Sequence, residues 1–424
     1  MTMVNAYTPG AGNLGPEDAA RIERRTRLLG PAYRLFYETP VHFVRGQGVW
    51  LYDAEGRAYL DCYNNVASLG HCHPHVTDAT ARQSTLYASH TRYLHDTVLD
   101  YAERLLATFP PELSHVMFTC TGSEANDLAL RIAFAHTGGT GVIVTENAYH
   151  GVTQATASLS PSLGAGVDLG PHIRTIPAPT DPARFATDVA QAARDLIRHG
   201  IRPAALLVDT IFSSDGVHAD PAGFLVPAAE AIRAEGGLFI ADEVQPGFGR
   251  TGDTFWGFQR HGVVPDMVSM GKPMGNGYPV AGLVLQPGVV AAFGAKARYF
   301  NTFGGNAVAA ATAMAVLDVI EAEGLQANAA RIGAQFRDGL LSLAHSHDSL
   351  GPLRSAGLFF GQDIVTDGQP DGPKAARIVN RLRENRILIS ATGPHGHVLK
   401  IRPPLVFTAG NVDQFLQGLA EALR

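Results

Sequence analysis

The sequence predicts an α/β protein with a mostly parallel, seven-stranded sheet and a smaller α+β domain at its C-terminal end. Seven short apolar runs alternate mainly with helical segments between residues 115 and 285, a pattern typical of strands that helices cover on both faces. After residue 305 the pattern changes to two long helices, followed by further strands and helices. A chain of 424 residues is also long enough for a large domain and a smaller one.

The elements follow in order along the chain. A polar helix is predicted near residues 18–29, and residues 41–61 alternate apolar and polar side chains around two turns, which predicts an antiparallel meander. Helical periodicity then covers residues 74–88 and 95–107. The seven strands of the large sheet are predicted at 115–119, 141–146, 172–176, 204–208, 237–241, 266–270 and 281–285. Beyond the two long helices, strands are expected near 357–365 and 397–401, with helices at 374–386 and 411–423.

These elements predict three parts of the chain. Residues 1–60 form an N-terminal segment that packs with the small domain, residues 61–305 form the large domain, and residues 306–424 form the small domain.

Composition excludes several classes of function. A net charge of −6 and the absence of a dense Lys/Arg run argue against nucleic acid or an anionic membrane as a partner. No stretch of 18 apolar residues is long enough to span a membrane. The three cysteines have no zinc-ligand spacing and do not suggest a disulfide framework, so we expect no metal site and a cytoplasmic location.

Two predicted strands of the large sheet lead to groups that suit covalent chemistry. The strand at 237–241 ends at Asp242, where a parallel sheet places its ligands, although a strand-end Asp can also cap the next helix. The strand at 266–270 ends before Lys272, which lies among glycines and a proline. A Lys in such a loop can lose its proton and attack an aldehyde, whereas taken alone it can be a surface residue.

Two more strand ends supply a phosphate cradle and an aromatic ring. Gly122 and Ser123 lie in a strand-to-helix turn whose free N–H groups suit an anion, although Gly-Ser also begins many helices as a cap. Tyr149 follows the next strand and offers a flat ring for stacking, or it is an ordinary core or surface aromatic. A phosphate cradle, a ring, a carboxylate and a Lys at one sheet edge together match the needs of pyridoxal 5'-phosphate.

The same segments resemble the class III aminotransferases, which are fold type I pyridoxal-phosphate enzymes, from about Phe43 to the C-terminus. Seven segments carry the resemblance in the family's order: 65–74, 121–126, 148–151, 241–245, 248–252, the Lys272 loop and 301–305.

The resemblance implies a role for each matching residue. Lys272 would form the Schiff base and transfer the proton, and Asp242 would pair with the pyridine nitrogen. Gly122 and Ser123 would hold the phosphate, while Tyr149 would stack on the ring. Gln245 would lie near the phenolic oxygen, and Thr302 would reach the phosphate of the neighbouring subunit, which implies an obligate homodimer with active sites at the interface.

A closer resemblance is to the phospholyases of this family that act on phosphoethanolamine or phosphohydroxylysine. It rests on residues 63–67, 92–96, 122–131, 270–277, 299–302 and 393–404. Where many aminotransferases of the class carry an Arg for the substrate carboxylate, this chain has Lys400, which cannot form a bidentate fork. Arg402, two residues further on, is an alternative ligand for the substrate carboxylate. Lys400 can also simply form an ion pair with a neighbouring acid. Asp209 stands where the family commonly has a Glu.

The sequence therefore predicts a phospholyase that converts a small phosphorylated amine to an aldehyde, ammonia and phosphate. The alternative is an aminotransferase that needs a keto acid, and the alternative from another class is a nucleotide-binding protein, which lacks the expected G-x-G-x-x-G turn. A substrate phosphate needs cations. The candidates for binding the substrate phosphate are Asn64, Asn65, Arg92, Lys400 and Arg402. Each of them can also be an ordinary helix-surface or loop residue.

Overall fold

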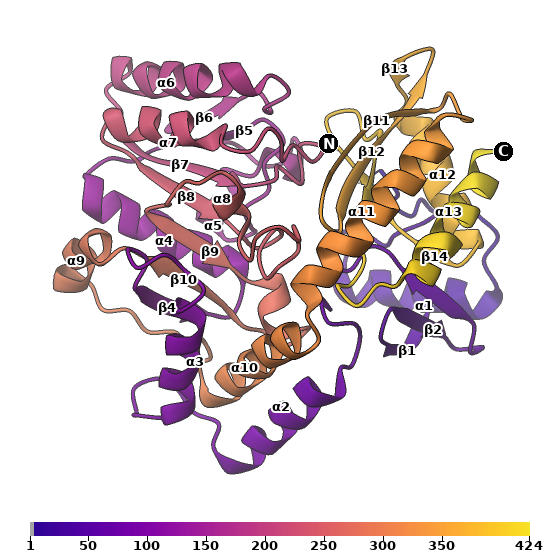
Figure 1. Ribbon diagram of the computed structural model, residues 1–424, viewed down its shortest axis with the longest axis horizontal. Helices are drawn as coiled ribbons and strands as arrows, with labels where there is room; N and C mark the ends of the chain where they lie inside the picture. Colours follow the sequence, from indigo (N-terminus) through magenta and orange to yellow (C-terminus); the bar gives the residue numbers. More distant parts are fainter. Residues whose placement is uncertain (1–3) are drawn as a thin grey trace.

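The computed structural model describes residues 4–424, and its largest element is the seven-stranded sheet that the sequence predicts (Figure 1). The spatial order of its strands is β4-β10-β9-β8-β7-β5-β6. Only β10 runs antiparallel to its neighbours, so the carboxyl ends of the other strands meet at one edge. The strands are β4 (His115–Thr119), β5 (Gly141–Thr145), β6 (Ile173–Ile176), β7 (Pro203–Asp209), β8 (Leu238–Asp242), β9 (Met267–Met270) and β10 (Ala281–Leu285).

Helices cover both faces of this sheet because successive side chains of each strand point to opposite sides. Val142, Val144 and Leu207 pack in the core beside α4 (Gly122–Thr137), whereas Ile143 and Leu206 pack beside α6 (Pro182–Arg198) and α7 (Leu225–Ala234). Both faces are therefore apolar, as expected for strands buried between two helical layers.

Two smaller sheets lie beside the large one. The C-terminal sheet has the order β11-β12-β16-β15, with β13 paired to β12, and helices α11, α12 and α13 accompany it (Figure 1). Its elements are β11 (Leu350–Ala356), β12 (Phe359–Thr366), β13 (Gln369–Pro370), β15 (Ser390–Thr392), β16 (Val398–Ile401), α11 (Leu325–Ala344), α12 (Gly372–Glu384) and α13 (Ala409–Leu423).

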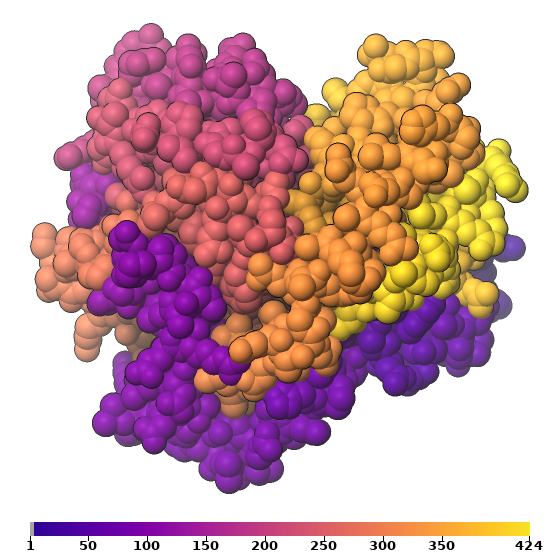
Figure 2. All heavy atoms as spheres, in the orientation of Figure 1, coloured from indigo at the N-terminus to yellow at the C-terminus, as the bar shows by residue number. Residues whose placement is uncertain are grey.

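The N-terminal meander forms the other small sheet and joins the C-terminal part of the chain. Its strands are β1 (Phe43–Gln47), β2 (Trp50–Asp53), β3 (Ala58–Asp61) and β14 (Ile387–Leu388). Because β14 pairs with β3, residues more than 300 positions apart lie side by side, and Figure 2 shows N-terminal atoms against C-terminal ones. The division into units at residues 61 and 306 stays a prediction, and residues 1–3 of the first unit lie outside the described residues.

The remaining helices connect these sheets. They are α1 (Pro16–Leu29), α2 (Pro74–Leu86), α3 (Asp96–Leu106), α5 (Gln154–Ala157), α8 (Gly257–Arg260), α9 (Pro287–Lys296) and α10 (Ala307–Ala322), with short 3-10 turns at Pro161–Leu163 and Lys272–Gly275. Within residues 4–424, no helix combines the length and the apolar character needed to cross a membrane.

Candidate active site

A cavity of about 310 Å³ lies at the carboxyl ends of the large sheet, where five strands end. Six of the residues predicted for the site line it: Gly122, Ser123, Tyr149, Asp242, Gln245 and Lys272. They follow β4, β5, β8 and β9, which lie far apart in the sequence but end at one edge because these strands run in the same direction.

The turn after β4 lines the cavity and begins helix α4. The Thr121 side chain accepts from the backbone N–H of Glu124 at 3.1 Å, and the Glu124 carboxylate accepts from the N–H of Thr121 at 3.0 Å. This capping box leaves the N–H groups of Gly122 and Ser123 without a hydrogen-bond acceptor inside residues 4–424. Free N–H groups at a helix start suit a phosphate.

The segment after β5 approaches this turn closely at Gly151. Gly151 has φ +136°, and a Cβ there would lie 2.6 Å from the Ser123 hydroxyl. Only glycine combines that backbone conformation with such a close contact. The approach places Tyr149 beside the turn at Gly122 and Ser123, with 37% of its surface exposed.

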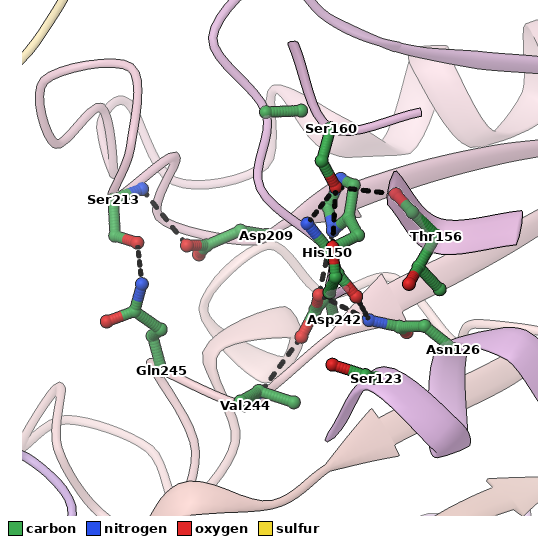
Figure 3. Close-up of polar contacts among 12 residues, drawn as sticks. Ser123, Asn126, His150, Thr156, Ser160, Asp209, Ser213, Asp242, Val244 and Gln245 are labelled. Carbon is green, nitrogen blue, oxygen red and sulfur yellow. Dashed lines mark hydrogen bonds and ion pairs between the residues drawn. The ribbon is translucent and has the colours of Figure 1, made fainter. Parts of the chain in front are cut away.

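Asp242 has three hydrogen-bond partners around the cavity (Figure 3). One carboxylate oxygen accepts from the Asn126 amide at 2.8 Å and lies 2.7 Å from Nδ1 of His150, while the other accepts from the N–H of Val244 at 3.1 Å. Asp242, Asn126 and His150 are each at least 95% buried. Asp242 is thereby fixed in one orientation towards the cavity.

Sequence reasoning missed the roles of Asn126 and His150. Both lie inside segments that resemble the family, but no feature of the sequence predicts that their side chains contact Asp242. The signals were present in the spacing: Asn126 follows Gly122 by about one helical turn, and His150 follows Tyr149 directly. Asn126 also donates to the backbone oxygen of His150 at 2.9 Å, so the three residues form one unit.

Lys272 lies in the turn after β9, at the floor of the cavity. Burial, and to a smaller degree the charge of Arg402, lowers the pKa of the Lys272 ammonium to about 8. A substantial fraction of the side chain is therefore a neutral amine in mildly alkaline solution, and the neutral amine is the form that attacks an aldehyde.

Asp209 is a second carboxylate of the cavity and lies directly beside the first. It ends β7, where its Cα pairs with that of Asp242 on β8. Burial and then the neighbouring charge of Asp242 raise the pKa of Asp209. The N–H groups of Ile211 and Ser213 donate to it at 3.0 and 3.1 Å.

Gln245 connects the cavity to Arg402, which directly follows β16 of the C-terminal sheet. Its amide donates to the Ser213 hydroxyl at 2.7 Å, and its oxygen accepts from Asn65 at 3.2 Å and from the Arg402 guanidinium. Arg402 also donates to the backbone oxygen of Tyr63 at 2.8 Å. Of the substrate candidates, Asn65 and Arg402 therefore touch a residue that lines the cavity.

Lys400 lies on β16 close to this network and is only 7% exposed. Burial, followed by repulsion from Arg402, lowers the pKa of Lys400 well below its usual value, and Asp209 opposes that shift. No carboxylate between residues 4 and 424 lies within ion-pair distance of Lys400 or Arg402, so neither side chain has a direct counter-ion, and the lowered pKa of Lys400 favours its neutral amine.

Six predicted residues do not line the cavity, namely Asn65, Lys400 and Arg402, described above, and Asn64, Arg92 and Thr302. Asn64 is held by Asp61, whose carboxylate accepts from its backbone N–H and its side-chain amide, both at 2.9 Å. Arg92 is exposed and stacks on Phe300, with 3.8 Å between the guanidinium carbon and the ring centre. Thr302 is exposed on the surface of the chain. In the described part of the chain, no cluster of His, Cys, Asp and Glu suits a metal ion.

Comparisons with known proteins show which family this chain resembles. The family model described as Aminotransferase class-III matches residues 36–423. A protein of Drosophila melanogaster named alanine–glyoxylate aminotransferase 2-like is 39% identical over 95% of this chain and 86% of its own length. Ethanolamine-phosphate phospho-lyase homolog 1 of Caenorhabditis elegans is 34% identical over 95% and 92%. The structure of a phospholyase from Arthrobacter in complex with phosphoethanolamine is 41% identical, covers 95% of this chain and 99% of its own, and superimposes with a TM-score of 0.92.

Proposed function

Since the chain belongs to the class III aminotransferases, whose cofactor is pyridoxal 5'-phosphate, we propose that it is a phospholyase. Its substrate would be a small phosphorylated primary amine such as O-phosphoethanolamine, and its products an aldehyde, ammonia and inorganic phosphate. The observation that carries the proposal is the buried pair Lys400 and Arg402, which has no ion-pair partner within residues 4–424. A dianion is the ligand that such a pair suits.

The residues of the cavity fit pyridoxal 5'-phosphate. The free N–H groups of Gly122 and Ser123 suit its phosphate, and Tyr149 offers a ring for stacking. Asp242 is oriented to accept a hydrogen bond from the pyridine nitrogen, and Lys272 supplies the amine. When bound, the cofactor supplies an aldehyde that attaches to an amine and a ring that withdraws electrons from the adjoining carbon.

The chain's own residues would then perform the proton transfer and hold the leaving group. The amine of Lys272 takes a proton from the carbon that carries the substrate nitrogen, and Asp242 keeps a proton on the ring nitrogen. Lys400 and Arg402 would bind the phosphate group and stabilise the negative charge on its oxygen, which keeps the bonding electron pair as the C–O bond breaks. Water completes the balance: one phosphorylated amine and one water give one aldehyde, one ammonia and one phosphate.

An aminotransferase is the second candidate, because one relative with 39% identity carries that name. An aminotransferase of α-amino acids must grip a carboxylate, and Lys400 cannot offer the bidentate fork of an Arg. Arg402 donates to Gln245 and to the backbone oxygen of Tyr63, and these contacts would limit its binding of a carboxylate and of a phosphate alike. It is therefore the Lys at position 400, in place of an Arg, that favours phosphate elimination over transamination.

The proposed substrate class is tested by comparing amines that differ only in the phosphate. O-phosphoethanolamine and ethanolamine are each incubated with the holoenzyme, with and without pyruvate. We expect kcat/KM for O-phosphoethanolamine to exceed that for ethanolamine by about 100-fold or more, since one buried charge-assisted contact alone contributes about ten- to hundredfold. Faster conversion of ethanolamine, and only with pyruvate, would instead identify an aminotransferase.

We also propose that the enzyme is a homodimer whose interface covers the exposed apolar side chains of Leu94 and Phe303. Leu94 is 94% exposed and Phe303 is 70% exposed, and Phe303 adjoins Thr302. Large apolar side chains left this exposed on one chain suit an interface with a second copy. A second copy seated there would bring Thr302 towards the partner's phosphate. The predicted cytoplasmic location stays a prediction.

If the enzyme is a homodimer, sedimentation experiments should give a mass twice the 45.0 kDa of one chain. Replacing Leu94 and Phe303 together by Glu should shift the species to a single chain, because buried unpaired charge opposes association. Leu341→Glu, on the exposed side of α11, is the matched control and should leave the mass unchanged. A wild-type protein that sediments as a single chain would contradict the proposal.

A further inference from the structure

Tyr63 contacts Arg402 through both its ring and its backbone, and the reaction described above gives its ring no role. The guanidinium carbon of Arg402 lies 4.3 Å from the centre of the Tyr63 ring, and Nε of Arg402 donates to the backbone oxygen of Tyr63 at 2.8 Å. The ring of Phe359 lies further from the guanidinium carbon, at 6.0 Å. Tyr63 therefore holds the guanidinium at one edge and on one face.

The orientation of Tyr63 is itself fixed from two sides. The fully buried carboxylate of Asp61 accepts from the backbone N–H of Tyr63 at 3.0 Å. The ring of Phe36 meets the Tyr63 ring edge-on, with 5.3 Å between the ring centres and 86° between the planes. The Tyr63 hydroxyl has no hydrogen-bond partner within residues 4–424, so the side chain offers Arg402 only the face of its ring.

The ring contact stabilises a buried cation without neutralising it. Arg402 is only 6% exposed, and a guanidinium keeps its charge at neutral and alkaline pH. Burial of such a charge is unfavourable unless a partner stabilises it, but a carboxylate partner would cancel the charge and compete with a bound anion. The face of an aromatic ring attracts a cation and carries no net charge. The positive charge of Arg402 therefore stays available to an anion.

The contacts of Arg402 also leave one edge of its guanidinium free. Nε donates to Tyr63 and Nη1 donates to Gln245, which lines the cavity, whereas Nη2 has no acceptor within residues 4–424. An Arg side chain has several rotatable bonds, so affinity for a ligand is lost when the side chain becomes ordered only on binding. A guanidinium that already lies against a ring avoids this loss.

We propose that Tyr63 is a positioning residue for the substrate phosphate: its ring holds the charged Arg402 guanidinium, in place of a carboxylate, with the Nη2 edge free for the anion. This inference rests on the proposed function, because it requires Arg402 to bind the substrate phosphate. Tyr63 does not line the cavity, so it acts through Arg402. Loss of the ring should therefore weaken substrate binding and leave the proton transfer by Lys272 nearly unchanged.

Tyr63→Leu tests the ring, and Tyr63→Phe is the matched rescue because it removes only the hydroxyl. Phosphate release from O-phosphoethanolamine by each holoenzyme is measured with and without sulfate as a competing dianion. Tyr63→Leu should raise KM and the inhibition constant of sulfate by about tenfold, the size of one partly desolvated cation–π contact, with kcat within about twofold of wild type. Tyr63→Phe should keep all three values close to wild type.

A series of fluorinated rings at position 63 separates electrostatics from packing. Phenylalanines with one, two or three ring fluorines, introduced by stop-codon suppression, nearly keep the shape of the ring, while each fluorine weakens the negative potential of its face. KM should therefore rise stepwise along the series. A ring that only fills space would instead give the same KM for every member.

Tyr52→Leu is the control for the loss of an Arg–Tyr contact elsewhere. Arg45 and Tyr52 are partners on β1 and β2, and the guanidinium carbon lies 3.6 Å from the ring centre. This contact is at least as close as the one at Tyr63, but neither residue lines the cavity. Tyr52→Leu should leave KM and the inhibition by sulfate unchanged. Circular dichroism and the cofactor spectrum verify that each variant is folded and loaded.

The possible outcomes separate this inference from the proposed function. A wild-type KM in Tyr63→Leu, or a constant KM along the fluorinated series, would overturn the role of Tyr63 and leave the phosphate site intact. No phosphate release by wild type, or sulfate inhibition that persists unchanged in Arg402→Met, would overturn the proposed phosphate site and this inference together. A stepwise rise of KM along the series, with no change in Tyr52→Leu, supports the inference.

Discussion

Lys272→Ala is expected to lower turnover by about 10⁴-fold or more, because the variant loses both the amine that attaches the cofactor and the group that moves the proton. The side chain lies at the floor of the cavity, and burial lowers the pKa of its ammonium to about 8. No other lysine lines the cavity in the described part of the chain. Turnover is measured as phosphate released from O-phosphoethanolamine.

A second readout separates chemistry from folding. Borohydride reduces the covalent link between a lysine and the cofactor aldehyde to a stable amine, and peptide mass spectrometry should find the added mass on Lys272 in wild type. Lys272→Ala should show no such peptide but the same far-ultraviolet circular dichroism. Lys296→Ala, at the end of the surface helix α9, is the control and should retain both activity and label. Substantial turnover by Lys272→Ala would remove this residue from the mechanism.

Lys400→Met is expected to lower kcat/KM for O-phosphoethanolamine by about 100-fold, mainly through KM, because it deletes the amine that a bound phosphate dianion would keep protonated in the proposed phosphate site. Methionine is similar in length and apolar, and Lys400 already lies near the Phe359 ring, at 5.7 Å from its centre. The substitution should therefore preserve packing. The measurement is steady-state kinetics of phosphate release.

The control for this variant is Lys374→Met on α12, away from the cavity, which should leave KM unchanged. A second comparison is Lys400→Arg, which restores the charge with a different shape. We expect Lys400→Arg to recover part of the lost affinity for phosphate. If Lys400→Met retained the wild-type KM, the dianion would have to bind elsewhere and the argument for a phospholyase would lose its main support.

Most of the fold could be predicted because its signals are local. Each strand of the large sheet is a short apolar run bounded by polar or glycine residues, and the structure has all seven within about one residue of the predicted ends. Strand β11 was not predicted, since Gly351 and Pro352 interrupt its apolar pattern. The very short strands β14 and β15 give almost no periodic signal.

The site could be predicted only in part, because several of its contacts depend on packing between distant segments. The position of Asp242 at a strand end is visible in the sequence, whereas its contact with His150 depends on how the segment after β5 folds back. The pairing of Asp209 with Asp242 depends on strand register. Likewise, the contact between Arg402 and Gln245 requires the C-terminal sheet to meet the large one.

The most direct test of the account is whether the holoenzyme releases phosphate from O-phosphoethanolamine repeatedly in the complete absence of a keto acid. Phosphate, acetaldehyde and ammonia are measured over time against the number of active sites. We predict equal amounts of all three, in many-fold excess over the enzyme, with no stimulation by pyruvate. If no phosphate is released, and amines are consumed only once per site until pyruvate is added, the enzyme is an aminotransferase and the proposed function is wrong.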